Sequence, residues 1–168
     1  GSVAIGMRLW KRASIARFFG DGPVRFLSDP VKARAFAAGT GRPLLQWGAP
    51  GQPAIDRRPG SIGIEDGFIR SRGLGAELVP AVSLVRDPDG IYYDPATPSR
   101  LEHLIAPSQD LPAMEMERAA RLRERLIQAA ISKYNLALPP PELPRTSRTR
   151  ILVVGQVEDD ASIRAGAS

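Results

Sequence analysis

The chain of 168 residues lacks cysteine entirely and has a single histidine, His103. Without cysteine it forms no disulfide and no thiolate metal site, and one histidine disfavours a His-ligated metal centre. No apolar run approaches the roughly 20 residues of a membrane-spanning helix. A signal peptide is also not expected, because the basic residues Arg8, Lys11 and Arg12 follow the first apolar run instead of preceding it. These absences favour a cytoplasmic protein.

Basic residues outnumber acidic ones by 23 to 18, which gives a net charge of +5. A positive field favours anionic partners, namely nucleic acid, phospholipid head groups or phosphate-bearing small molecules. The alternative is a basic, solvated surface with no specific partner. Nucleic acid is the least favoured partner, because the arginine-rich helix expected over residues 112–132 has no interleaved aromatic residues.

Short apolar segments alternate with helical patterns in the first 64 residues. Strands are expected over residues 3–6, 24–27, 43–47 and 61–64, and helices over 7–19 and 30–38, the second of which would end at Gly39. Gly1 and Ser2 resemble a cloning remnant and are left out of this prediction. Strands and helices that alternate at this pace predict an α/β fold, a Rossmann-like parallel sheet with crossover helices.

The pattern changes after residue 64. Two short apolar segments, 81–85 and 90–93, flank a turn sequence and predict a β-hairpin insertion. Helices are expected over 98–105 and 112–132, followed by a proline-rich linker and a strand over 150–154. We therefore predict a Rossmann-like domain over 3–138, a linker over 139–149, and the start of a truncated second domain over 150–168.

The first candidate site lies in the segment 65–75, which follows a predicted parallel strand. Open α/β sheets bind their ligands at this end of their strands. Glu65 and Asp66 are suited to acid/base chemistry or to holding sugar hydroxyls, and Arg70 and Arg72 to binding a carboxylate or phosphate. The equally weighted alternative is a structural loop in which the acidic residues and arginines pair with each other.

The second candidate site is the acidic run 158–160, which follows the last predicted strand. Three acidic residues suggest a magnesium site or a carboxylate nucleophile for glycosyl transfer. The alternative is the amino-terminus of a helix, where acidic side chains complement the helix dipole and cap its amide groups. From the local sequence alone, this alternative is the stronger one.

Six blocks of sequence occur in order at close spacing. They are IEDGFIRS at 64–71, LG at 74–75, SLV at 83–85, DGIYYD at 89–94 followed by PS at 98–99, SKYNL at 132–136, and GQ at 155–156 ahead of DAS at 160–162. Together they resemble the bacterial capsule polysaccharide synthesis and export family, from about residue 3 onward. Members of that family resemble β-Kdo glycosyltransferases, which move 3-deoxy-manno-octulosonic acid (Kdo) from CMP-Kdo to a phospholipid-based acceptor.

The resemblance implies a two-domain, GT-B-type transferase in which this chain forms the acceptor-side half. It implies that Asp160 is the nucleophile of a retaining mechanism and that Glu65 and Asp66 line the cleft as acid/base or acceptor-binding groups. Substrate-binding roles are expected for Arg70, Ser71, Arg72 and Gln156. No cofactor or metal is expected, because the CMP leaving group carries a single phosphate.

The resemblance also leaves one block unmatched. The His-Pro block that holds the CMP phosphate in the family does not occur before Ser168, so we expect the isolated chain to be inactive and the longer protein to be the enzyme. The expected partners are a nucleotide sugar and a glycolipid acceptor, with peripheral contact to anionic inner-membrane lipid or to capsule export proteins. The alternative function is a non-catalytic binding or scaffold domain of the capsule assembly machinery.

Overall fold

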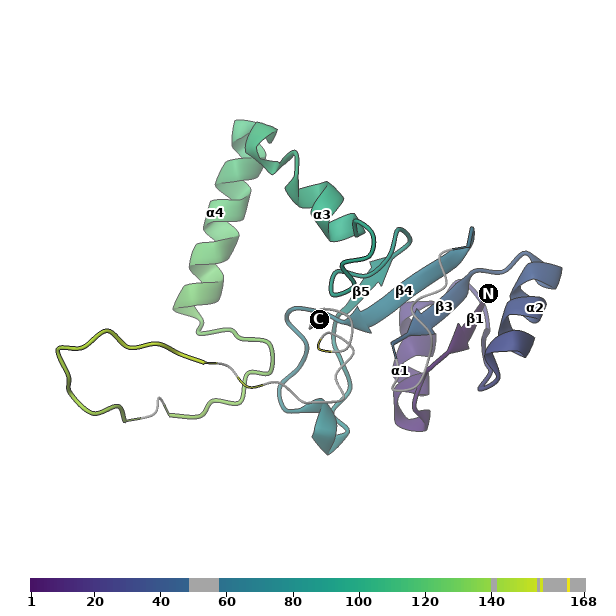
Figure 1. Cartoon of the computed structure of the whole chain (residues 1–168), viewed down its shortest axis with the longest axis horizontal. Helices are drawn as coiled ribbons and strands as arrows, with labels where there is room; N and C mark the ends of the chain where they lie inside the picture. The colour runs from purple at the N-terminus through teal and green to yellow at the C-terminus, as the bar shows by residue number, and fades with distance from the viewer. Residues whose placement is uncertain (49–57, 140–141, 154, 156–162, 164–168) are drawn as a thin grey trace.

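The computed structural model describes residues 1–48, 58–139, 142–153, 155 and 163, and it contains one mixed sheet. Its strands are β1 (Ser2–Ile5), β2 (Val24–Phe26), β3 (Leu44–Trp47), β4 (Ser61–Asp66) and β5 (Leu84–Asp87), in the order β2-β1-β3-β4-β5. The first four are parallel, and β5 is antiparallel to β4 (Figure 1). The predicted α/β fold with a parallel sheet is confirmed.

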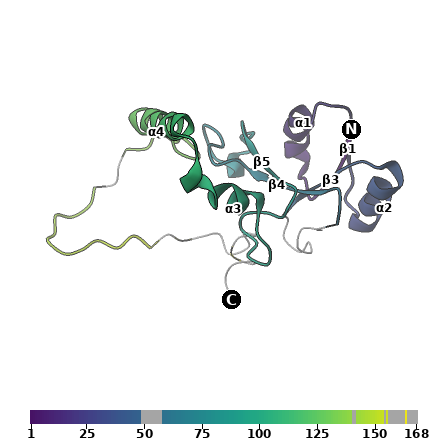
Figure 2. The same cartoon turned by 90° about the horizontal axis from the view of Figure 1, so that it is seen from above.

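The helices α1 (Leu9–Phe18) and α2 (Pro30–Thr40) cover opposite faces of this sheet (Figure 2). On one face, Ile15 of α1 packs with Leu45 and Ile64. On the other, Ala33 and Ala37 of α2 pack with Val3, Ile5 and Leu44. Side chains alternate between the two faces of a strand, and both faces are covered, which explains why the strands are short and almost wholly apolar.

The ends of α2 follow recognisable capping rules. The Asp29 side chain accepts hydrogen bonds from the amides of Val31 and Lys32, and Pro30 occupies the first turn. At the other end Gly41, with φ of 65°, adopts the left-handed conformation that closes the helix. The expected stop at Gly39 is therefore wrong by two residues, because Gly39 lies inside the helix.

The predicted hairpin between residues 81–85 and 90–93 is wrong. β5 pairs with β4, placing Leu84 opposite Asp66 and Asp87 opposite Gly63. Residues 90–93 form no strand, and Tyr92 and Tyr93 lie in a turn. The buried Asp87 carboxylate accepts hydrogen bonds from the amides of Asp89, Gly90 and Arg100. This carboxylate satisfies the turn's donors, so the chain after β5 is tied to the next helix instead of returning as a strand.

Helices α3 (Arg100–Ile105) and α4 (Ala113–Gln128) lead away from the sheet (Figure 1). Two short 3₁₀ turns, Gly75–Glu77 and Ser108–Asp110, complete the regular elements of the described chain. No residue of α4 is buried. Among the described residues, no helix is both long and apolar enough to cross a membrane.

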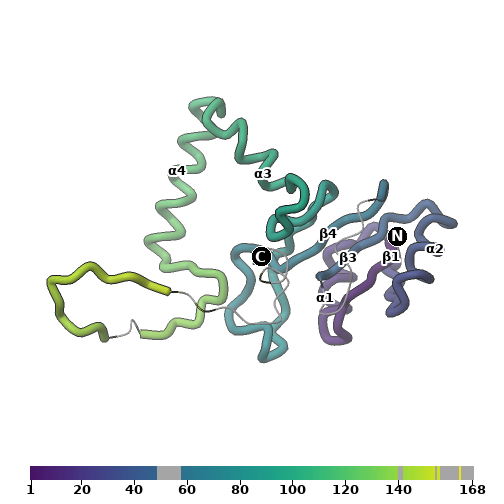
Figure 3. The backbone as a smooth tube through the Cα atoms, viewed as in Figure 1, coloured from purple at the N-terminus to yellow at the C-terminus, as the bar shows by residue number. Residues whose placement is uncertain are grey.

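The strand expected over 150–154 is not formed in the part that the structure describes. Residues 150–153 have no regular structure, and Ile151, Leu152 and Val153 are each more than four-fifths exposed. Val154 lies outside the described residues. Figure 3 traces residues 142–153 as a long excursion away from the sheet. A strand needs a neighbouring strand for its backbone hydrogen bonds, and these residues have none beside them in the described chain.

Candidate functional site at the carboxyl edge of the sheet

The site lies where the carboxyl ends of β1, β3 and β4 meet. β1 has β2 on one side and β3 on the other, so the crossover direction reverses between β1 and β3, and a crevice at such a point is the usual ligand position in open α/β sheets. The backbones approach closely here: a Cβ added to Gly6, whose φ is +77°, would lie 2.3 Å from the carbonyl oxygen of Trp47. Glycine is therefore required at the end of β1.

Lys11, in the first turn of α1, occupies this crevice. Its ammonium lies 3.4 Å from the centroid of the Trp47 ring and 3.6 Å from Oδ2 of Asp66. Burial lowers the pKa of Lys11; the carboxylates of Asp66 and Glu65 act in the opposite direction, and Arg70 adds to the lowering. The aromatic face and the carboxylate together stabilise a cation that is only partly hydrated.

Asp66 is the acceptor of a second cation. Nε of Arg70 lies 2.8 Å from the same Oδ2 atom, and the Arg70 side chain is 1% exposed. The Nε–H bond does not point at Oδ2 closely enough to form a hydrogen bond, so the contact is an ion pair only. Asp66 Oδ1 and Arg70 Nη2 are also buried, and neither has a hydrogen-bond partner among the described residues. Buried polar atoms without hydrogen-bond partners are uncommon in protein cores and are typical of functional sites.

Arg70 also organises the loop around it. Its Nη1 donates to Ser71 Oγ at 2.8 Å and to the carbonyl of Val79 at 2.9 Å, while its own carbonyl accepts from the amide of Val82. The guanidinium packs on Gly75, where an added Cβ would lie 2.9 Å from Nη2. The structural alternative considered from the sequence, an acid paired with an arginine, is therefore what the structure shows for Asp66 and Arg70.

The segment 132–135 docks onto the same loop from far along the chain. The carbonyl of Lys133 accepts hydrogen bonds from the amides of Arg70 and Ser71, at 2.8 and 3.2 Å. Asn135 Nδ2 donates to the carbonyl of Ser71 at 2.9 Å. Two of the six sequence blocks thus meet in space, which gives the SKYN block a structural role in holding the Arg70 loop.

Glu65 belongs to the opposite face of the sheet from Asp66. Ile62 and Ile64 pack on the α1 face, and alternation along β4 assigns Asp66 to that face and Glu65 to the other. Burial raises the pKa of Glu65 to about 7, and the negative charge of Asp66 adds to the rise. A hydrogen bond of 2.8 Å from the Asp66 amide to Glu65 Oε1 opposes it, as do Lys11 and Lys133. A carboxyl group with this pKa exchanges protons near neutral pH.

The structure brings Asp66, Arg70 and Ser71 together and leaves Glu65 next to Asp66 on the other face of the sheet. Both acids lie inside β4 instead of beyond its end. Arg72 is exposed. Asp160 and Gln156 lie outside the described residues, so their expected roles stay predictions. Sequence reasoning missed Lys11 and Trp47, although both follow or end strands whose carboxyl ends form the crevice.

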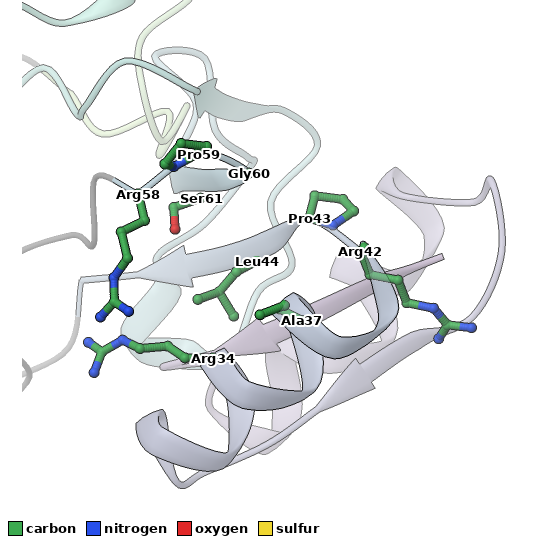
Figure 4. Close-up of a pocket in the computed structure, with 11 residues that line it drawn as sticks. Arg34, Ala37, Arg42, Pro43, Leu44, Arg58, Pro59, Gly60 and Ser61 are labelled. Atoms are coloured by element: carbon green, nitrogen blue, oxygen red, sulfur yellow. The ribbon is translucent and has the colours of Figure 1, made fainter.

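Several cavities lie outside this acid–base cluster, and arginines line at least two of them. A groove of about 530 Å³ runs beside α1 and is lined by eight residues that include Trp10, Arg17 and Val82. A pocket of about 440 Å³ lies at the opposite edge of the sheet, near the end of α2 (Figure 4). There Arg34 and Arg58 extend their guanidinium groups to the same side, and Arg42 points away. The described residues contain no group of three or more metal-ligating side chains.

Comparison with known proteins gives one consistent result. Residues 60–140 match the family described as capsule polysaccharide biosynthesis protein. The capsule polysaccharide modification protein LipA of Neisseria meningitidis serogroup A is 42% identical over 97% of this chain, and the lipopolysaccharide-processing protein LpsZ of Rhizobium meliloti is 39% identical over 99%. The family resemblance seen in the sequence is confirmed.

Solved structures agree with these relatives. Two Thermosulfurimonas dismutans KpsC structures superpose with TM-scores of 0.71 and 0.72, at 34% and 30% identity, and are described as β Kdo 2,7 and β Kdo 2,4 transferases. This chain spans 24% of LipA, 40% of LpsZ and 51% of each KpsC chain.

Proposed function

Because this chain is a relative of the capsule polysaccharide biosynthesis proteins, we propose that it forms the acceptor-side part of a retaining glycosyltransferase that moves Kdo from CMP-Kdo to a phospholipid-based acceptor. The observation that carries the proposal is the likeness to the two Kdo transferase structures over nearly all of this chain, at 30% identity or more. The buried, partly unsatisfied Asp66–Arg70 pair supports it, because it lies where such a sheet binds ligands.

The residues of the site suggest distinct tasks. Glu65, with a pKa near neutral, is the group suited to exchange a proton with an acceptor hydroxyl. Asp66, held by Lys11 and Arg70, is suited to fix these two cations beside the crevice, where they can meet an anionic substrate group. Asp160 remains the proposed nucleophile, on the family resemblance alone.

A transferase assay with a protein that contains this chain and has the length of its relatives tests the proposal. CMP-Kdo and a Kdo-free glycolipid acceptor are supplied, and product is followed by mass spectrometry. Transfer of Kdo with retained β configuration is the expected result. No transfer from CMP-Kdo, combined with transfer from another nucleotide sugar, would contradict the proposed donor.

A second candidate function, membrane or scaffold docking, is favoured by one observation. No residue of helix α4 is buried, and exposed apolar residues such as Leu122 and Ile127 lie on this helix together with four arginines. Flotation with anionic vesicles tests it. Leu122→Glu should reduce flotation, while Leu143→Glu, at a similarly exposed leucine outside any helix, should not.

A further inference from the structure

The groove beside α1 is continuous with the Asp66 site. Trp10, Ser14 and Ala81 line both the groove and the small recess that Asp66 and Arg70 also line. Helix α1 begins at this recess and runs away from it, so Trp10 lies at the end near Asp66, and Arg17 and Phe18 lie at the far end. Arg17 follows Trp10 by seven positions, a helical rise of about 10 Å, which one sugar and the long Arg17 side chain can span together.

The wall of the groove opposite α1, formed by residues 80–82, is held in place by Arg70. Arg70 donates to the carbonyl of Val79 and accepts from the amide of Val82, so the segment 79–82 is held by the residue that pairs with Asp66. Across the floor, Ser14 Oγ donates to the carbonyl of Ala81 at 3.4 Å. These hydrogen bonds fix both walls of the groove relative to Asp66 and Arg70.

The lining combines aromatic faces with one cation. Trp10 and Phe18 supply the rings, Pro80 and Val82 supply aliphatic surface, and Arg17 supplies the charge. Phe18 is 44% exposed and Val82 70% exposed, so the groove is open to water along one side. An open, aromatic groove leaves the hydroxyls of a sugar hydrated while its C–H faces cover the rings, and the guanidinium suits a carboxylate.

We propose that this groove is a subsite for an acidic sugar residue of the acceptor chain, with its ring on Trp10 and its carboxylate on Arg17. The proposal rests on the proposed function, because it takes Asp66 as part of the transfer site. A lipid acyl chain is the less suitable occupant, since part of its apolar surface would stay exposed to water in an open groove. The subsite would hold a sugar already present in the acceptor beside the point of transfer.

The indole signals of the two tryptophans of the chain allow the subsite to be tested, because only Trp10 lines the groove. Trp10 lines the groove, whereas Trp47 is 8% exposed beneath Lys11. In a ¹H–¹⁵N spectrum of the 168-residue chain, free Kdo should shift the indole signal of Trp10 and leave that of Trp47 in place. Trp10→Phe assigns the signals. Two other ligands are titrated in parallel. Galactose serves as the neutral sugar, and lysophosphatidylglycerol, below its critical micelle concentration, serves as the lipid.

Two pairs of variants test the recognition. Arg17→Gln should weaken Kdo binding by about tenfold without changing galactose binding, because it removes a charge-assisted hydrogen bond. Arg123→Gln, on the exposed helix α4, is its control. Val82→Asp should weaken Kdo binding by about tenfold through charge repulsion. Val31→Asp, at a position 72% exposed on the other helix layer, should not.

Three results would overturn the subsite: no Trp10 shift with Kdo, equal loss in Arg17→Gln and Arg123→Gln, or a larger Trp10 response to the lysophospholipid than to Kdo. These outcomes are separate from those of the transfer assay. A protein that transfers Kdo but shows no Trp10 response contradicts the subsite alone. A chain whose Trp10 responds as expected, in a protein that transfers no Kdo, contradicts the proposed function alone.

Discussion

The guanidinium of Arg70 lies 2.8 Å from the carboxylate of Asp66, four residues earlier, and is almost completely buried. This pair joins the end of β4 to the loop that follows it. Because Arg70 also bonds the carbonyl of Val79 and the hydroxyl of Ser71, one side chain connects the acidic site, the loop and the groove wall. The same arrangement makes the pair central to stability and leaves Asp66 Oδ1 unbonded within the described chain.

Replacing Arg70 by methionine should lower the free energy of unfolding by about 3 kcal/mol, because Asp66 loses its closer cation and keeps only Lys11, and the hydrogen bonds to Ser71 and Val79 are also lost. Urea denaturation of the 168-residue chain measures the change. Arg72→Met is the matched control, because Arg72 is exposed two residues away, and its effect should stay within about 0.5 kcal/mol. Equal effects of the two substitutions would show that the buried pair contributes nothing specific.

Glu65→Gln should stabilise the protein at pH 8 and leave it unchanged near pH 4. The pKa of Glu65 is raised from 4.5 to about 7 in the folded state, so the folded protein holds more protons than the unfolded one between these values. The free energy of unfolding of the wild type therefore falls as pH rises from about 4.5 to about 7, by about 3 kcal/mol at most. Glutamine keeps an oxygen to accept the Asp66 amide and removes the titration.

Denaturation at a series of pH values from 4 to 8 measures this difference. Glu77→Gln, at an exposed glutamate in the same region, is the control, and its effect at pH 8 should stay within about 0.5 kcal/mol. A parallel pH dependence for wild type and Glu65→Gln would contradict the raised pKa.

Gly67→Ala should destabilise the protein, whereas Gly39→Ala should stabilise it. A Cβ at Gly67 would lie 2.0 Å from Ser83 Oγ and 2.8 Å from the Ser83 carbonyl carbon, which is backbone and cannot turn away. Forcing such an overlap costs about 1–3 kcal/mol. At Gly39, inside α2, an added Cβ meets nothing within 4 Å, and alanine should stabilise the helix by about 0.5–1 kcal/mol. Thermal unfolding of the two variants should show a lower Tm for Gly67→Ala and a higher Tm for Gly39→Ala than for the wild type.

Substitutions at the acidic residues should separate their roles in Kdo transfer by a protein that contains this chain and has the length of its relatives. Asp160→Ala and Asp160→Asn should abolish transfer, because the covalent route through the sugar's anomeric carbon is removed. Asp66→Asn and Glu65→Gln should leave residual activity, since acid/base assistance contributes about 10²–10⁴-fold. Mass spectrometry with CMP-Kdo should find a Kdo adduct on the peptide that contains Asp160. An adduct on the peptide that contains Glu65 and Asp66 would reverse the assignment.

Local sequence signals were sufficient for the regular elements of the first 66 residues. The apolar segments predicted the four parallel strands, and Asp29 with Pro30 predicted the start of α2, because a short apolar run indicates a buried strand and capping depends on neighbouring residues. The predicted hairpin was wrong because strand pairing is a tertiary property, and β5 pairs with β4 instead. The turn sequence at 87–90 looks like a hairpin turn, but the Asp87 carboxylate directs it to the amide of Arg100.

The sequence by itself determined the fold class, the family and the acidic pair at the end of β4, since each is written in the order and type of nearby residues. Only the tertiary structure decided how that pair is used. Glu65 and Asp66 are adjacent in the chain, yet strand alternation sends them to opposite faces, where one is desolvated and the other is held by Lys11 and Arg70. Lys11 lies 55 positions earlier in the sequence, and only the closing of β1 against β3 brings it to Asp66, because the charge and burial around a carboxyl group depend on what the fold places beside it.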